Sequence, residues 1–233
     1  MLELQNVGLT LQARRILNNV SFEVERRSIH VVLGQNGAGK SSLLKLILGI
    51  YECQEGKILF DKQQLTSATR TSYLRKMGAL IENASLYSHL TAFQNLELLR
   101  RIYKTEKTYS DELLSLVGLL HKRDEKVRYF SLGMKQRLGL AMAMIGKPEL
   151  IVLDEPTNGL DPDGVSDLKK LILKFNNDMD TTFLLSSHHL HEAEQIATHV
   201  TIMQGGTAKL STKLEGERKG KLEELYFNIA SNY

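Results

Sequence analysis

The fold of this chain is decided by the stretch Gly34-Gln35-Asn36-Gly37-Ala38-Gly39-Lys40-Ser41. It fits the pattern G-x-x-x-x-G-K-[ST] of a nucleotide-binding P-loop, which kinases, GTPases and motor ATPases share. A strand-like segment, 28–33, precedes it, and an apolar helical segment, 40–48, follows it. Strand, loop and helix are the context that this motif requires, so the stretch predicts a nucleotide-binding α/β fold without choosing among those classes.

The glycines of this loop allow the backbone to bend so that consecutive N–H groups point at phosphate oxygens, and the next helix adds its positive end. Lys40 is expected to reach the β and γ phosphates of ATP, and Ser41 to give its hydroxyl to Mg²⁺. The residues predicted to bind the nucleotide are Gly34, Gln35, Asn36, Gly37, Ala38, Gly39, Lys40, Ser41 and Ser42.

Two carboxylates, Asp154 and Glu155, follow an all-apolar segment that ends at Leu153. An isolated Asp-Glu pair is more often a solvated turn than a site. A doubly wound sheet, however, exposes its ligands at the carboxyl ends of its strands, so a P-loop chain favours the site. Asp154 is then expected to hold Mg²⁺ through a water molecule, and Glu155 to polarise the water that attacks the γ phosphate.

The remaining pattern predicts an α/β core interrupted by a helical insertion. Strand-like segments are expected at 2–7, 20–24, 57–60, 77–81, 150–153, 182–186 and 199–203, and helices at 163–175 and 190–197, with helical periodicity from 91 to 145. We predict an ATP-binding core over 1–82 and 146–210 and a helical subdomain over 83–145. The tail, 211–233, is predicted to be short and helical or partly mobile.

Composition agrees with a domain that has a sizeable core, because 42% of the 233 residues are hydrophobic and the formal net charge is only +3. Basic residues are interleaved with acidic ones, so no nucleic acid is expected as a partner. The longest apolar run, 42–50, is broken by Lys45 and is far shorter than the roughly 20 residues that span a bilayer. The start of the chain has no signal-peptide pattern, and a cytoplasmic location is expected.

Ser131-Leu132-Gly133-Met134-Lys135-Gln136-Arg137 adds a second motif, and Asn158-Gly159-Leu160-Asp161 a third. With the P-loop, they make residues 1–210 resemble the nucleotide-binding domain of ABC transporters. The first resembles the family's signature, with Leu132 in place of a glycine and Met134 in place of a glutamine. The second resembles the D-loop, in which Asp161 is also suited to cap the next helix. The resemblance implies a P-loop NTPase with a mainly parallel sheet, an N-terminal antiparallel β segment and an inserted helical subdomain.

The family resemblance implies that Ser131 and Gly133, at the start of a helix, grip the γ phosphate of ATP bound to a second copy of the chain. Ser131 alone would otherwise be interpreted as a helix N-cap. A homodimer that encloses two ATP molecules is the implied assembly. The segment Ser186-Ser187-His188-His189 resembles the switch loop, so His188 is expected to contact the γ phosphate. A metal cluster at His189 and His191 has no supporting ligand spacing.

Two positions depart from the family pattern. Leu11 stands where an aromatic ring commonly stacks on adenine, which predicts an apolar and weaker contact. Glu82 stands where most members carry a glutamine, and its carboxylate either binds Mg²⁺ directly or repels the γ phosphate. The segment 77–91, together with 130–134 and 157–160, resembles the branch of bacitracin-resistance and lantibiotic self-protection transporters.

The resemblance implies a bacterial ABC exporter subunit that hydrolyses ATP and powers a separate membrane permease, on the inner face of the cell membrane. An antimicrobial peptide, contacted by the permease, is the expected cargo. A nutrient importer or another exporter is the nearest alternative. An ABC ATPase in translation or DNA maintenance is disfavoured, because such proteins usually carry two domains on one chain or a very long coiled-coil insertion.

Overall fold

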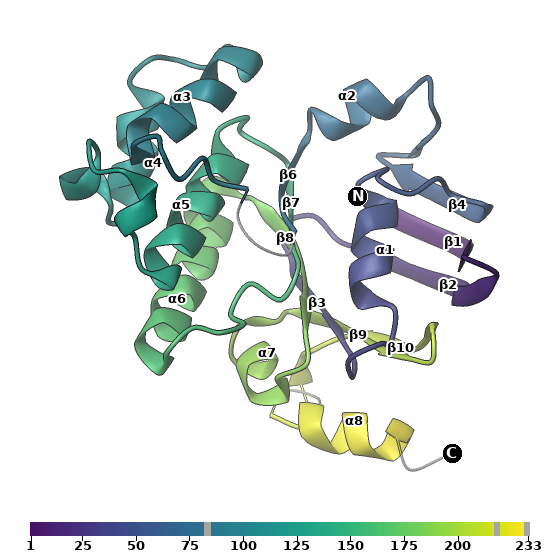
Figure 1. Cartoon of the computed structure of the whole chain (residues 1–233). Helices are drawn as coiled ribbons and strands as arrows, with labels where there is room; N and C mark the ends of the chain where they lie inside the picture. Colours follow the sequence, from purple (N-terminus) through teal and green to yellow (C-terminus); the bar gives the residue numbers. More distant parts are fainter. Residues whose placement is uncertain (82–84, 217–219, 231–233) are drawn as a thin grey trace. The chain divides into compact units, whose positions relative to one another are not determined.

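The structure is a computed structural model that describes residues 1–81, 85–216 and 220–230 (Figure 1). The chain forms two compact units. The first unit comprises Met1–Tyr73 and Thr182–Tyr233, and the second comprises Leu74–Thr181. Each is described by itself below. The α/β fold expected from the sequence is confirmed, whereas the predicted boundaries of core, helical subdomain and tail stay predictions.

The first unit begins with an antiparallel sheet in the order β2-β1-β4-β5. Its strands are β1 (Leu2–Leu11), β2 (Arg14–Val24), β4 (Glu55–Phe60) and β5 (Gln63–Gln64). Buried and exposed residues alternate along β2 because successive side chains point to opposite faces of the sheet. The antiparallel segment implied by the family resemblance is therefore confirmed.

The same unit holds a second group of strands, in the order β10-β9-β3-β8, in which β3 is parallel to both of its neighbours. They are β3 (Ile29–Leu33), β8 (Thr182–Ser187), β9 (His199–Gln204) and β10 (Thr207–Lys213). Every residue of β3 and β8 is buried, as is typical of parallel strands covered on both faces.

Helices surround these strands. Helix α1 (Lys40–Ile47) packs on β2 and β8, α7 (Leu190–Ile196) packs on β3, and α8 (Leu222–Ala230) packs on α7. Leu222, at the start of α8, is fully buried, and its N–H donates to Glu194 Oε1 on α7 at 2.9 Å. Helix α8 is therefore docked within the first unit. The short helix α2 (Arg70–Leu74) leads out of this unit.

The second unit pairs two parallel strands with a set of helices. Strand β6 (Met77–Leu80) lies beside β7 (Leu150–Leu153), and their register places Leu80 opposite Leu153. The helices are α3 (Ala92–Tyr103), α4 (Tyr109–Leu116), α5 (Leu132–Met144) and α6 (Pro162–Met179), with 3-10 turns at Leu120–Lys122 and Val127–Tyr129. Gly78 allows β6 to approach α5, because a Cβ there would meet Ala143 O at 2.1 Å.

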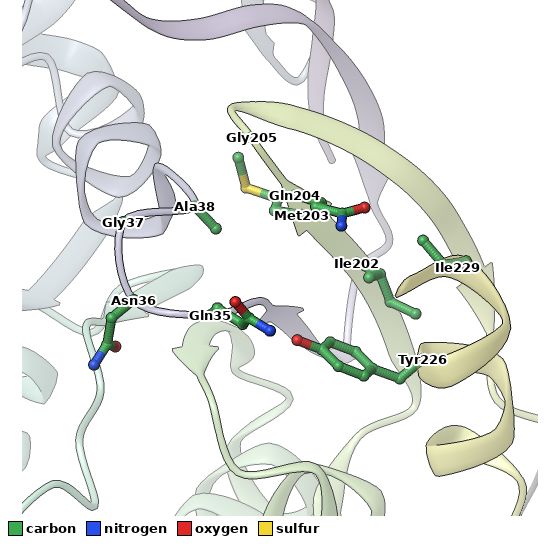
Figure 2. Close-up of a pocket in the computed structure, with 10 residues that line it drawn as sticks. All are labelled: Gln35, Asn36, Gly37, Ala38, Ile202, Met203, Gln204, Gly205, Tyr226 and Ile229. Atoms are coloured by element: carbon green, nitrogen blue, oxygen red, sulfur yellow. The ribbon is translucent and has the colours of Figure 1, made fainter. Parts of the chain in front are cut away.

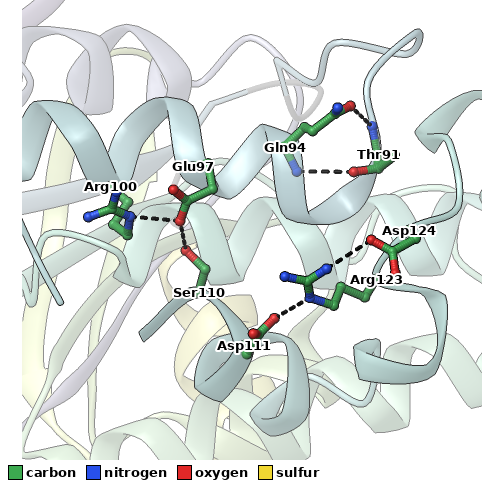
Figure 3. A network of polar contacts seen from close by, with 8 residues as sticks. All are labelled: Thr91, Gln94, Glu97, Arg100, Ser110, Asp111, Arg123 and Asp124. Carbon is green, nitrogen blue, oxygen red and sulfur yellow. Dashed lines mark hydrogen bonds and ion pairs between the residues drawn. The ribbon is translucent and has the colours of Figure 1, made fainter. Parts of the chain in front are cut away.

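Polar contacts fix the start of α3 in this unit (Figure 3). Helix α3 starts with a capping box, in which Gln94 N donates to Thr91 Oγ1 at 3.1 Å and Thr91 N donates to Gln94 Oε1 at 2.9 Å. This arrangement satisfies N–H groups that a helix start leaves without an intrahelical acceptor. It explains in local terms why α3 begins where it does.

A carboxylate joins α3 to α4. Glu97 Oε1 accepts from Arg100 Nε at 2.7 Å and from Ser110 Oγ at 2.8 Å (Figure 3). Burial alone would raise the pKa of Glu97, but the hydrogen bonds from Arg100 and Ser110 outweigh it and hold that pKa below its usual value. Glu97 is therefore ionised at neutral pH and acts as a polar link between the two helices.

The described residues, which leave out 82–84, 217–219 and 231–233, form no helix that is both long enough and apolar enough to span a bilayer.

Candidate functional site

The P-loop of the first unit runs from the end of β3 into α1, as expected. Gly37 and Gly39 adopt positive φ angles of 81° and 98°, which glycine adopts without a steric penalty. Glycine is required at position 34 for another reason, since a Cβ there would meet Met203 O at 2.5 Å. These glycines let the backbone turn sharply, so that the loop leads directly into the first turn of α1.

Lys40 is the cation of this loop. Its side chain is almost fully buried, and Nζ donates to Gly34 O at 2.8 Å and to Gln35 O at 3.2 Å. The ammonium group is thus centred within the loop, while Ser41 and Ser42 follow on the first turn of α1 and are half-buried. Open space surrounds the position of a Cβ on Gly37. Backbone N–H groups, a helix N-terminus and a buried ammonium fit a nucleotide phosphate.

The end of β8 lies against the start of this loop. Gly34 N donates to Ser187 O at 3.3 Å, and the register pairs Leu33 with Ser187. His188 is the next residue, half-buried, with its ring centre 3.9 Å from that of His189. The structure therefore brings His188 to the P-loop within one unit. His189 occupies the cap position of α7, and His191 lies within that helix, where its Nε2 is 2.9 Å from Gln195 Nε2.

A cavity of about 150 Å³ adjoins the P-loop in the first unit (Figure 2). The loop contributes Gln35 and Ala38, strand β9 contributes Gln204, and α8 contributes Tyr226 and Ile229. In Figure 2 the Tyr226 ring points from α8 toward Gln35. Helix α8 therefore lies next to the P-loop. This neighbour was not predicted: the spacing of Leu222, Tyr226 and Ile229 indicates one helix face, but not the segment that this face contacts.

Leu11, which stands where the family carries an adenine-stacking ring, is the last residue of β1, at the hairpin that leads into β2. It is half-buried. The nature of its contact with adenine stays a prediction.

The second unit contains the two predicted carboxylates. Asp154 and Glu155 directly follow β7, whose four residues are all buried. Asp154 is itself buried, and its N–H donates to Leu80 O at 2.9 Å, so the backbone of β6 fixes its position. Glu155 is half-buried and has a positive φ of 43°, an uncommon conformation for a residue other than glycine. Glu82 lies outside the described residues.

The signature segment begins α5, and the D-loop segment begins α6. Ser131 Oγ accepts from Met134 N at 3.3 Å, so Ser131 is an exposed N-cap, and Gly133 follows within the first turn. Asp161 caps α6 in the same way, because its Oδ1 accepts from Gly164 N at 2.9 Å. Both caps are confirmed, and Ser131 and Gly133 stand together at an exposed helix start that suits an anion. Their role in nucleotide binding stays a prediction.

Comparison with known proteins agrees with this geometry. Residues 17–158 match the family described as ABC transporter. The lantibiotic transport ATP-binding protein SrtF of Streptococcus pyogenes is 36% identical over 228 residues, which cover 98% of this chain and 96% of SrtF. The bacitracin transport ATP-binding protein BcrA of Bacillus licheniformis is 35% identical over 220 residues, which cover 94% of this chain and 71% of BcrA. A solved dimeric ATP-binding cassette in a post-hydrolysis state, bound to ADP and Pi, has a TM-score of 0.82 and 25% identity, covering 93% of this chain and 100% of its own.

Proposed function

Because the chain belongs to the ABC transporter family, as an ATP-binding subunit with the fold of an ABC ATPase, we propose that it powers a bacterial exporter of antimicrobial peptides. The permease is a separate polypeptide, and the cargo is a lantibiotic or a bacitracin-type peptide that is expelled to protect the cell. The observation that supports this cargo is the similarity to SrtF, which extends over nearly the full length of both chains.

Within the site, Lys40 and the loop N–H groups bind the phosphates of ATP. Ser41 would hold Mg²⁺ through its hydroxyl, Asp154 through a water molecule and Glu82 through its carboxylate, because oxygen atoms are the ligands that this ion prefers. When bound, the ion would neutralise charge on the phosphates. His188 contacts the γ phosphate, next to the start of the loop.

Glu155 polarises the attacking water as a general base, which contributes roughly a hundredfold to ten-thousandfold in rate. The chain works as a homodimer in which Ser131 and Gly133 of one copy grip the γ phosphate of ATP on the other. Loss of that phosphate removes the contact and reopens the dimer, so the difference in binding between ATP and ADP acts as a switch. The switch moves the permease, which holds the chain at the inner face of the cell membrane.

The test compares a deletion strain with a strain that carries the wild-type gene, using growth inhibition by a panel of lantibiotics and bacitracin. We expect selective sensitivity to one peptide class in the deletion strain, and its cure by the wild-type gene. Unchanged tolerance to every peptide would reject the peptide cargo and favour a nutrient importer or another exporter.

Purification of the tagged chain from membranes tests the partner separately. We expect an integral membrane protein to co-purify with the chain. Co-sedimentation with ribosomes or DNA, in the absence of a membrane partner, would overturn the transport role in favour of a non-transport ABC ATPase.

A further inference from the structure

Two leucine–glycine contacts join the start of α5 to the turn before α6. A Cβ built on Gly159 would lie 3.2 Å from Cδ2 of Leu132, and a Cβ built on Gly133 would lie 3.9 Å from Cδ2 of Leu160. Each leucine therefore lies against the glycine of the other segment. All four residues belong to the second unit, so the contacts are internal to one compact body.

The leucines stand next to the two helix caps. Leu132 is the first residue of α5 after its cap Ser131, and Leu160 directly precedes Asp161, the cap of α6. Both caps use their side chains to accept a hydrogen bond from the first turn of their own helix. The contacts therefore join two exposed helix starts within one unit.

The turn on which Leu160 lies begins at Glu155. Asn158 N donates to Glu155 O at 3.0 Å, and Leu160 N donates to Thr157 O at 3.2 Å. These hydrogen bonds place Leu160 and the backbone of Glu155 in one connected turn.

Leu132 is not needed to fill a core. Its side chain is 42% exposed, in contrast to Leu138 and Leu140 of the same helix, which are fully buried. An exposed leucine contributes little to stability by burial. Its contact with the D-loop turn is the local consequence of having a leucine, and not a glycine, at this position of the signature segment.

We propose that Leu132 and Leu160 are positioning residues for ATP hydrolysis. Their contacts fix the position of the Ser131 end of α5 relative to the turn that starts at Glu155. The inference rests on the proposed roles of Ser131 and Glu155. The contacts would join, within one chain, the group that contacts one nucleotide and the group that hydrolyses the other nucleotide.

The experiment uses the full chain and the variants Leu132→Ala, Leu160→Ala and the double variant, with kcat and KM for ATP hydrolysis and a direct titration of nucleotide affinity. We expect each single variant to lower kcat about tenfold, because small misplacements of catalytic groups are costly. Nucleotide affinity at the P-loop should not change. The loss of kcat in the double variant should be no larger than in a single variant, because both substitutions disrupt the same contact region. Leu132→Met, which keeps the volume, should restore most of kcat.

The matched control is Leu98→Ala. Leu98 lies on α3 of the same unit and is 41% exposed, so the substitution removes the same surface without touching either helix start. A kcat for Leu132→Ala equal to that of Leu98→Ala would overturn the proposal, as would a double variant whose loss equals the product of the single losses. Since the assay contains neither permease nor peptide, a failed peptide test in cells leaves this result standing, and the reverse also holds.

Discussion

Acid should destabilise the first unit through His30, a histidine on β3. Its side chain is 1% exposed, and Nε2 lies 2.8 Å from Thr201 Oγ1. Burial, with a smaller contribution from the charge of His199, lowers the pKa of His30 to about 3 from its ordinary value of 6.5. The unfolded chain therefore takes up this proton first, so the stabilisation is complete above pH 6.5 and is lost as the pH falls toward 3.

The magnitude follows from the two pKa values. Between pH 7 and pH 5 the unfolded state gains about 2 kcal/mol from protonation of His30, whereas the folded state gains almost nothing. We expect the free energy of unfolding, measured by urea titration, to decrease as the pH falls from 7 to 5. This decrease should be about 2 kcal/mol smaller in His30→Gln than in the wild type. Glutamine retains a group that can hydrogen-bond to Thr201 but has no proton to gain. Identical pH dependence in the two proteins would refute the assignment to His30.

Three further predictions concern packing, capping and binding. Gly78→Ala should lower the free energy of unfolding by about 3 kcal/mol, because its Cβ would overlap the α5 backbone; thermal denaturation measures this, with the exposed Ala79→Ser as control. Asp161→Ala removes the cap of α6 and should lower that free energy by about 1 kcal/mol, and an unchanged urea midpoint would contradict the prediction. Lys40→Ala should weaken ATP binding at least about tenfold in a fluorescence titration, whereas wild-type affinity would exclude the ammonium from phosphate binding.

The parts of the fold that local patterns specify could be predicted from the sequence. The P-loop between β3 and α1, the buried strand before Asp154 and the caps Ser131 and Asp161 each depend on a few adjacent residues with a known geometric requirement. The start of α1 is a case in point, because the glycine, lysine and serine spacing alone locates it. Features that depend on a few adjacent residues can therefore be predicted from a single sequence.

Features that depend on distant partners were missed. Strands β1 and β2 are longer than predicted, because irregular register and the positive φ angles of Asn6 and Asn19 interrupt the alternation that marks a strand. Strand β10 was not predicted, since it has few apolar residues and is specified by its pairing with β9.

The candidate site shows the same limit. The proximity of Tyr226 to the P-loop and the contact of Leu132 with Gly159 both join segments far apart in the sequence. No local pattern encodes either contact, because each arises only when separate helices pack in the same unit. The residue types could be read from the sequence, but their neighbours could not.

The most direct test of an ATP-powered protective role is the inhibitory peptide concentration in a deletion strain that expresses wild type, Glu155→Gln or Glu149→Gln. Glu149 precedes the opposite end of β7, where its carboxylate is 3.3 Å from Lys76 Nζ, so the control makes the same chemical change in the same unit. Wild type and Glu149→Gln should restore tolerance, while Glu155→Gln should bind ATP, lose at least about a hundredfold in hydrolysis and leave the strain sensitive. Full protection by Glu155→Gln would contradict the claim that hydrolysis at this carboxylate powers the export.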